Sequence, residues 1–147
     1  MKRFAFYGRL STTDKQDPAL SFPSQRKACE RKVAELGGKI TCEFTDQESG
    51  AKQDRPGWST LAAEARDLDG RRFDAVVIYQ TSRLARDLYV AHLFEKELHE
   101  VGVSIYYAVG GGDPDTPEGG LMINVQRALD KYLRDQLARE TKRGMRE

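Results

Sequence analysis

The chain has 147 residues, enough for one ordinary domain with a buried core but not for two full ones. Its 24 basic residues nearly cancel its 23 acidic ones, so the overall charge excludes a broadly polycationic protein, and any nucleic-acid surface has to be a local cluster. Cys29 and Cys42 have the spacing of neither a zinc site nor a disulfide framework and are interpreted as core residues. No signal segment or membrane-spanning run is present, which predicts a cytoplasmic protein without a membrane partner.

Short apolar runs alternate with amphipathic stretches along most of the chain. The expected strands are residues 3–8, 39–45, 73–79 and 103–109, and the expected helices are residues 21–36, 58–68 and 88–101. The third strand is nearly continuously apolar, as expected for a strand covered on both faces. This order predicts an α/β fold with an open, mostly parallel sheet of about four to five strands flanked by helices.

The last segment has a different pattern. After the glycine- and proline-rich run 110–117, a helical pattern runs from about Glu118 to the final residue. Its apolar stripe consists of Leu121, Val125, Ala128, Leu129, Tyr132, Leu133 and Leu137. Because a helix rises ~1.5 Å per residue, part of it must project beyond a small domain. We therefore divide the chain into a domain, 1–117, and a long C-terminal helix, 118–147, that either mediates self-association or is a disordered charged end.

Polar residues that suit phosphate chemistry follow two of the expected strands. Arg9 and Ser11 end the first strand, and Arg83 and Arg86 follow the third. Ligands of open α/β sheets bind beyond the carboxyl ends of the strands, so these groups are expected to converge. Arginines neutralise an anionic phosphate while a hydroxyl attacks it, which favours phosphoryl transfer. Taken alone, Ser11 is better interpreted as a strand-end cap than as a nucleophile.

The polar segment 46–57 is too long for a plain connection and is interpreted as an active-site loop with Asp46 and Ser49. Ser49 either caps this loop or contacts phosphate. His92 and His99 lie in a helical stretch and are interpreted as surface residues, so a Ser-His-Asp triad is not expected. The acidic residues nearby lack a metal-ligand pattern, so no metal is expected.

Four ordered segments resemble the catalytic domain of serine site-specific recombinases, the resolvase and invertase family. They are Tyr7–Thr12, Ser82–Asp87, Asp46–Gly50 with Asp54–Gly57, and Arg139–Gly144. The resemblance covers essentially the whole chain. It is closer to the large, phage-integrase type of serine recombinase, because the linker from Ser11 to Gln25 is longer than in small resolvases and because Ser82 stands where many members have an aspartate.

The resemblance implies that Ser11 attacks a DNA phosphate, giving a 5′-phosphoserine and a free 3′ hydroxyl. The residues that would bind the phosphate are Arg9, Arg83 and Arg86, assisted by Arg55 and Gln25. It further implies no metal or cofactor, double-stranded DNA as partner, and a homodimer and homotetramer assembled through the C-terminal helix. Ser82 stands in place of that aspartate. A carboxylate at this position is therefore not expected to orient Arg83 or to transfer a proton.

The basic end of the chain is a candidate DNA contact. Its residues are Arg139, Lys142, Arg143 and Arg146, and the alternative is a solvated helix end that the helix dipole favours. The chain is expected to be a catalytic domain whose DNA-binding region lies outside it.

Two other functions remain open from the sequence alone. A flavodoxin-like phosphate- or nucleotide-binding or signalling module would use the same sheet edge, but no glycine-rich phosphate loop follows the first strand. A catalytically idle DNA-binding or assembly protein is disfavoured because Ser11 is present together with the arginines.

Overall fold

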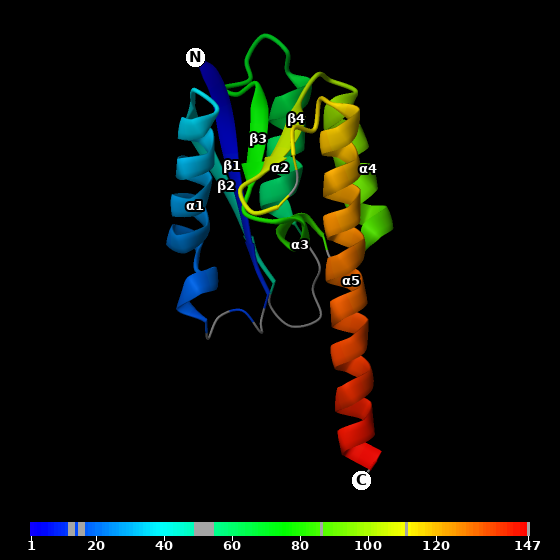
Figure 1. The fold of residues 1–147 in the computed structure, drawn as a ribbon. Helices are drawn as coiled ribbons and strands as arrows, with labels where there is room; N and C mark the ends of the chain where they lie inside the picture. Colours follow the sequence, from blue (N-terminus) through cyan, green and yellow to red (C-terminus); the bar gives the residue numbers. More distant parts are fainter. Residues whose placement is uncertain (12–13, 15–16, 49–54, 86, 111, 147) are drawn as a thin grey trace.

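The centre of the molecule is a parallel sheet in the order β2-β1-β3-β4 (Figure 1). The computed structural model describes residues 1–11, 14, 17–48, 55–85, 87–110 and 112–146, with the side chains of Leu88 and of 141–146 excepted. Its strands are β1 (Lys2–Leu10), β2 (Gly38–Gln47), β3 (Ala75–Ile78) and β4 (Ser104–Tyr107). The predicted open α/β architecture is confirmed, with four strands in the part of the chain that is described.

Helices cover both faces of this sheet. They are α1 (Phe22–Glu35), α2 (Pro56–Arg66), α3 (Thr81–Leu84), α4 (Leu88–His99) and α5 (Pro117–Arg146), with a 3-10 turn, η2 (Pro18–Leu20), before α1. Cys29 and Val33 of α1 pack on one face with Phe4 and Phe6. Helices α2, α3, α4 and the start of α5 pack on the opposite face. The sheet is therefore buried on both sides, which explains its nearly continuous apolar strands.

The structure moves some of the predicted boundaries. Pairing of β1 with β2 continues to Leu10 opposite Gln47, so Asp46 lies in β2 and not in a loop as predicted. Helix α2 begins at Pro56, two residues earlier than expected, because proline suits the first turn of a helix. Helix α3 was not predicted, since four residues are too few to show helical periodicity.

Helix α5 is predicted correctly as one long element, and its 30 residues extend about 45 Å. It packs on the domain near its N-terminal end, where Ile123 and Arg127 are buried. It then projects beyond the carboxyl end of the sheet, on the side where α3 lies (Figure 1). The large apolar side chains that it leaves exposed are Leu121, Met122, Val125, Leu129, Tyr132, Leu133 and Leu137. The exposed stripe thus begins in the first turns of the helix and not only in the projecting part.

Candidate active site at the carboxyl edge of the sheet

Ser11 directly follows β1 and is almost fully buried, at 4% exposure. A short turn, in which the amide of Asp14 donates to the carbonyl of Ser11 at 3.1 Å, brings the Asp14 carboxylate back onto the serine. Oδ2 of Asp14 accepts hydrogen bonds from Ser11 Oγ at 2.7 Å and from Ser11 N at 2.8 Å. The serine hydroxyl is therefore oriented by a carboxylate three residues later in the chain.

The same carboxylate oxygen binds the guanidinium of Arg83. Nη1 of Arg83 lies 2.5 Å from Asp14 Oδ2, and both side chains are more than nine-tenths buried. Burial alone would raise the pKa of Asp14, but the hydrogen bonds from Ser11 and Arg83 outweigh it and lower that pKa to about 2. Nε of Arg83 is buried and has no hydrogen-bond partner in the described part of the chain. One donor of this arginine is consequently spare.

Arg9 is the largest fully buried side chain among the described residues, at 2% exposure. Its Nε and Nη2 donate to the carbonyls of Arg83 and Ser82 at 3.0 and 2.5 Å, and its Nη1 pairs with Glu48. Burial lowers the pKa of Arg9, repulsion from Arg55 acts in the same direction, and Glu48 opposes both. Arg9 thus ties the end of β1 to α3, the helix that carries Arg83.

Gln25 in α1 fixes the backbone at this point from the other face of the sheet. It is fully buried, and its Nε2 donates to the carbonyls of Arg9 at 3.2 Å and of Leu20 at 2.7 Å. Its Oε1 accepts from the amide of Arg9 at 3.4 Å. In this structure Gln25 therefore supports the strand end that precedes the serine.

Arg55 lines a neighbouring cavity of about 400 Å³. Its guanidinium donates to the carbonyl of Leu84 and stacks 5.2 Å from the ring centre of Phe94. The lining also includes Arg9 and Trp58, whose buried Nε1 has no hydrogen-bond partner among the described residues. The carboxylates of Glu48 and Asp87 also line this cavity and balance the charges of the two guanidiniums.

Comparison with known proteins identifies the family of the chain. Residues 4–147 match the family model described as "Resolvase, N terminal domain". The chain belongs to the resolvase family of serine recombinases. It is 30% identical over 141 residues to the DNA-invertase of Escherichia phage P1, covering 95% of this chain and 66% of that protein. It is 27% identical to the serine recombinase PinR of Escherichia coli strain K12, covering 99% of this chain and 69% of that protein.

The fold is also that of solved recombinase domains. The structure titled N-terminal catalytic domain of TP901-1 integrase superposes with a TM-score of 0.66 at 23% identity, covering 92% of this chain and 98% of that one. The match supports the fold. The chain spans just under two thirds of the length of the phage P1 invertase.

The structure brings Ser11, Arg9 and Arg83 together, and Arg55 lines the cavity that adjoins them. Two of the predicted site residues, Arg86 and Ser49, lie outside the described residues. Among the four basic residues predicted to bind DNA, Arg139 is exposed on the projecting part of α5, and the side chains of the other three, Lys142, Arg143 and Arg146, are not described.

Asp46 is buried, and its side-chain contacts are structural. Its carboxylate accepts from Tyr7 Oη at 2.7 Å and from the amides of Gly57 and Trp58 at 2.8 and 2.9 Å, at the start of α2. A side chain at Gly57 would place its Cβ 2.4 Å from the carbonyl oxygen of Thr45, so only glycine permits this close approach. Asp46 therefore fastens α2 to the end of the sheet.

Asp14 is the residue that sequence reasoning missed. It lies in the polar stretch after β1, and a lone aspartate there carries no periodic signal. Its spacing of three residues from Ser11 is typical of side chains that bond back to the local backbone, which is the one clue the sequence contains. The structure shows that Arg83 has a carboxylate partner although Ser82 stands where an aspartate was expected.

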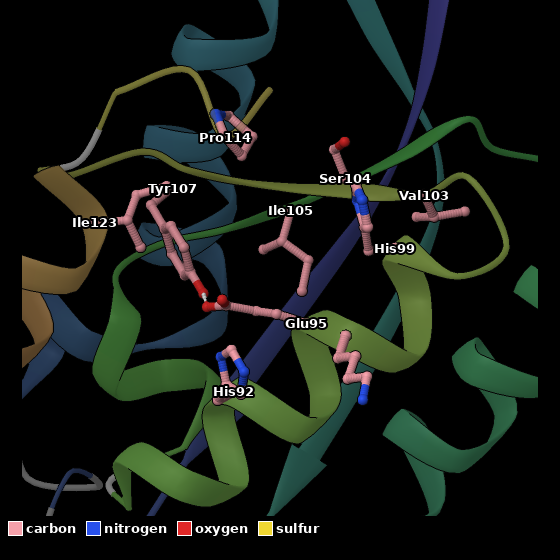
Figure 2. Close-up of a pocket in the computed structure, with 10 residues that line it drawn as sticks. His92, Glu95, His99, Val103, Ser104, Ile105, Tyr107, Pro114 and Ile123 are labelled. Carbon is pink, nitrogen blue, oxygen red and sulfur yellow. Dashed lines mark hydrogen bonds between the residues drawn. The ribbon is translucent and has the colours of Figure 1, made fainter. Parts of the chain in front are cut away.

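A second cavity, of about 260 Å³, lies between α4, β4 and the start of α5 (Figure 2). His92 and His99 line it and are exposed, as predicted. Glu95 at its wall accepts from Tyr107 Oη at 2.8 Å and pairs with Arg127, which anchors α5. Ser11, Asp14 and Arg83 are not among the residues that line this cavity. Among the described residues, no helix could span a membrane and no acidic, histidine or cysteine cluster could hold a metal ion.

Proposed function

We propose that this chain is the catalytic domain of a site-specific DNA recombinase, which cleaves DNA by transferring a backbone phosphate to Ser11 and later reverses that transfer. The observation that carries the proposal is the shared contact at Asp14: the Ser11 hydroxyl and the Arg83 guanidinium bind the same carboxylate oxygen, at 2.7 and 2.5 Å. A single oxygen atom thus bridges the nucleophile and a phosphate-binding group. A phosphate that takes the place of this oxygen at Arg83 would lie next to the Ser11 hydroxyl.

The charge of the site suits this reaction. A phosphodiester is anionic, and its pentacoordinate transition state spreads negative charge over the equatorial oxygens. Guanidiniums that are already positioned stabilise this charge without reorganising during the reaction. Arg83 and Arg9 are held in this way at the end of β1, and Arg55 faces the adjoining cavity. Arg86 is proposed to act with them.

Cleavage would join the 5′ phosphate to Ser11 and release a 3′ hydroxyl. The phosphoserine ester conserves the energy of the broken bond, so rejoining needs no cofactor. A flavodoxin-like binding module, the other function considered, would form no such ester, and the match to the resolvase family disfavours it.

Assembly is proposed to use α5. Seven of the described side chains of this helix are large, apolar and exposed, and contiguous exposed apolar surface typically marks an interaction site. We assign residues 118–147 to the contacts of a dimer and of the tetramer in which strands are exchanged. The basic end, Arg139 with Lys142, Arg143 and Arg146, would contact the phosphates of double-stranded DNA.

A trapping experiment tests the chemistry. The full natural chain is incubated with a pool of random-sequence duplexes, and protein joined covalently to DNA is recovered under denaturing conditions. We expect an adduct whose DNA is attached to Ser11, and no adduct from Ser11→Ala. Ser104→Ala is the matched control, because Ser104 lies on β4 beside the second cavity and should leave the yield unchanged. Failure of the wild-type protein to form an adduct, or an adduct that survives Ser11→Ala, would refute the proposal.

A further inference from the structure

The proposed attack requires Ser11 to lose a proton, because a neutral hydroxyl is a weak nucleophile. Both histidines of the chain lie around the second cavity (Figure 2). The Glu48 carboxylate is paired with the buried guanidinium of Arg9, and that of Asp46 holds the start of α2. By contrast, Asp14 already accepts the hydrogen bond of the hydroxyl, at 2.7 Å.

We propose that Asp14 is a catalytic residue, which takes the proton of Ser11 as the serine attacks DNA, and that Arg83 restrains it until a phosphate arrives. This inference rests on the proposed function, since it concerns the same reaction. It assigns a role to a residue that the sequence patterns did not single out.

The restraint follows from the contacts of one oxygen atom. Oδ2 of Asp14 accepts from Ser11 N, Ser11 Oγ and Arg83 Nη1. A carboxylate with these donors binds a proton weakly, and its pKa is lowered to about 2. The resting site therefore keeps the hydroxyl oriented but protonated.

A DNA phosphate changes this balance by competing for Arg83. Nε of Arg83 is buried and has no hydrogen-bond partner among the described residues, so this donor has no protein contact to lose when the guanidinium turns to a phosphate. When Arg83 turns to the phosphate, Asp14 loses its cationic neighbour, stays buried and gains an anionic one. Each of these changes favours the protonated carboxyl. Asp14 thus becomes a better proton acceptor only when the substrate is present.

The Oγ–P bond forms while the bond from phosphorus to the 3′ oxygen breaks, and the Ser11 proton passes to Asp14 Oδ2. The departing 3′ oxygen takes a proton from water and leaves as a hydroxyl. In rejoining, the 3′ hydroxyl attacks the phosphoserine, gives its proton to water, and Asp14 returns its proton to Oγ as the Oγ–P bond breaks.

The test measures single-turnover cleavage by the full natural chain on a duplex recovered from the trapping experiment. Asp14→Asn keeps the shape of the side chain but cannot take the proton, and we expect cleavage to slow by about 100-fold or more. For the wild type, the rate should rise with pH and then level off as Asp14 ionises in the complex. For Asp14→Asn it should keep rising by about tenfold per pH unit, because only hydroxide then takes the proton.

Two controls separate proton transfer from positioning. Asp17→Asn changes a neighbouring, exposed aspartate whose side chain accepts only from the amide of Ala19 in the described structure, and it should cleave at the wild-type rate. In a Ser11→Cys background the thiol ionises without help, so adding Asp14→Asn should cost less than about fivefold. DNA affinity, measured by fluorescence anisotropy, should not fall in Asp14→Asn, because Arg83 is released.

Each outcome decides one question. If the wild type forms no adduct, the proposed function fails and this inference with it. If the wild type cleaves and Asp14→Asn slows by less than about threefold, or keeps the wild-type pH profile, the function stands and Asp14 is not the proton acceptor. If the Ser11→Cys protein is inactive, the pH profile alone decides whether Asp14 is the proton acceptor.

Discussion

Replacing Asp46 by alanine tests whether the carboxyl edge of the sheet is held by buried polar contacts. The substitution leaves the hydroxyl of Tyr7 buried without its acceptor, which costs about 1–3 kcal/mol. It also removes the acceptor of the first amides of α2, a cap worth about 1 kcal/mol. We expect the free energy of unfolding to fall by about 3 kcal/mol in total, and the melting temperature by about 10 °C.

Urea unfolding provides the assay. Trp58 is the only tryptophan, is 3% exposed and packs 5.1 Å from the ring centre of Tyr7, so its fluorescence reports the loss of this region. A double-mutant cycle with Tyr7→Phe should give a coupling energy of about 1–2 kcal/mol. Asp17→Ala, at an exposed cap, should cost less than about 1 kcal/mol. A loss below about 0.5 kcal/mol for Asp46→Ala, or no coupling with Tyr7→Phe, would refute the reasoning.

Three further predictions concern the site and α5. Because the pKa of Asp14 is lowered, its contribution to stability is complete above about pH 4 and is lost as pH falls toward 2; Asp14→Asn should flatten this part of the curve of unfolding free energy against pH. Thr81→Val removes the 2.8 Å hydrogen bond from Thr81 to Asp130 of α5, and should lower stability by about 1 kcal/mol and speed amide exchange in α3 more than in β3. Leu133→Glu places a charge in the exposed stripe of α5, and should weaken self-association by at least about tenfold in sedimentation without changing the melting temperature of the monomer; unchanged association would exclude this part of α5 from the interface.

The fold was predictable because its elements carry strong patterns. Residues 75–78 are apolar without interruption, and that is typical of a strand buried on both faces. The apolar stripe and the absence of internal proline indicated α5. The end of β2 was misjudged because Asp46 and Gln47 are polar, and polar residues in a run usually indicate a loop. Their place in the sheet depends on pairing with Leu10 and on the buried hydroxyl of Tyr7, which no local pattern contains.

The site was predictable in its serine and arginines but not in their partners. Arg9 and Ser11 are adjacent to one strand end, and Arg83 follows the neighbouring strand, so sheet topology brings them to the same edge. What each guanidinium binds depends on side-chain geometry across distant segments. Arg9 reaches the carbonyls of Ser82 and Arg83, and Asp14 reaches across to Arg83. The carboxylate partner of Arg83, Asp14, could therefore be identified only from the folded structure.

The contacts of α5 join the proposed assembly element to the proposed site. Asp130 on α5 accepts from Thr81 in the first turn of α3, and Arg83 lies in the same short helix. A helix of four residues is too short to move one end independently of the other, so displacement of α5 along its axis must either break the bond to Thr81 or shift the backbone that carries Arg83. The second contact, the buried pair of Arg127 with Glu95, ties the same stretch of α5 to α4. A change in the packing of α5 that keeps the bond between Asp130 and Thr81 would thus shift Arg83 relative to Asp14, so assembly through α5 could alter the contact that restrains the nucleophile.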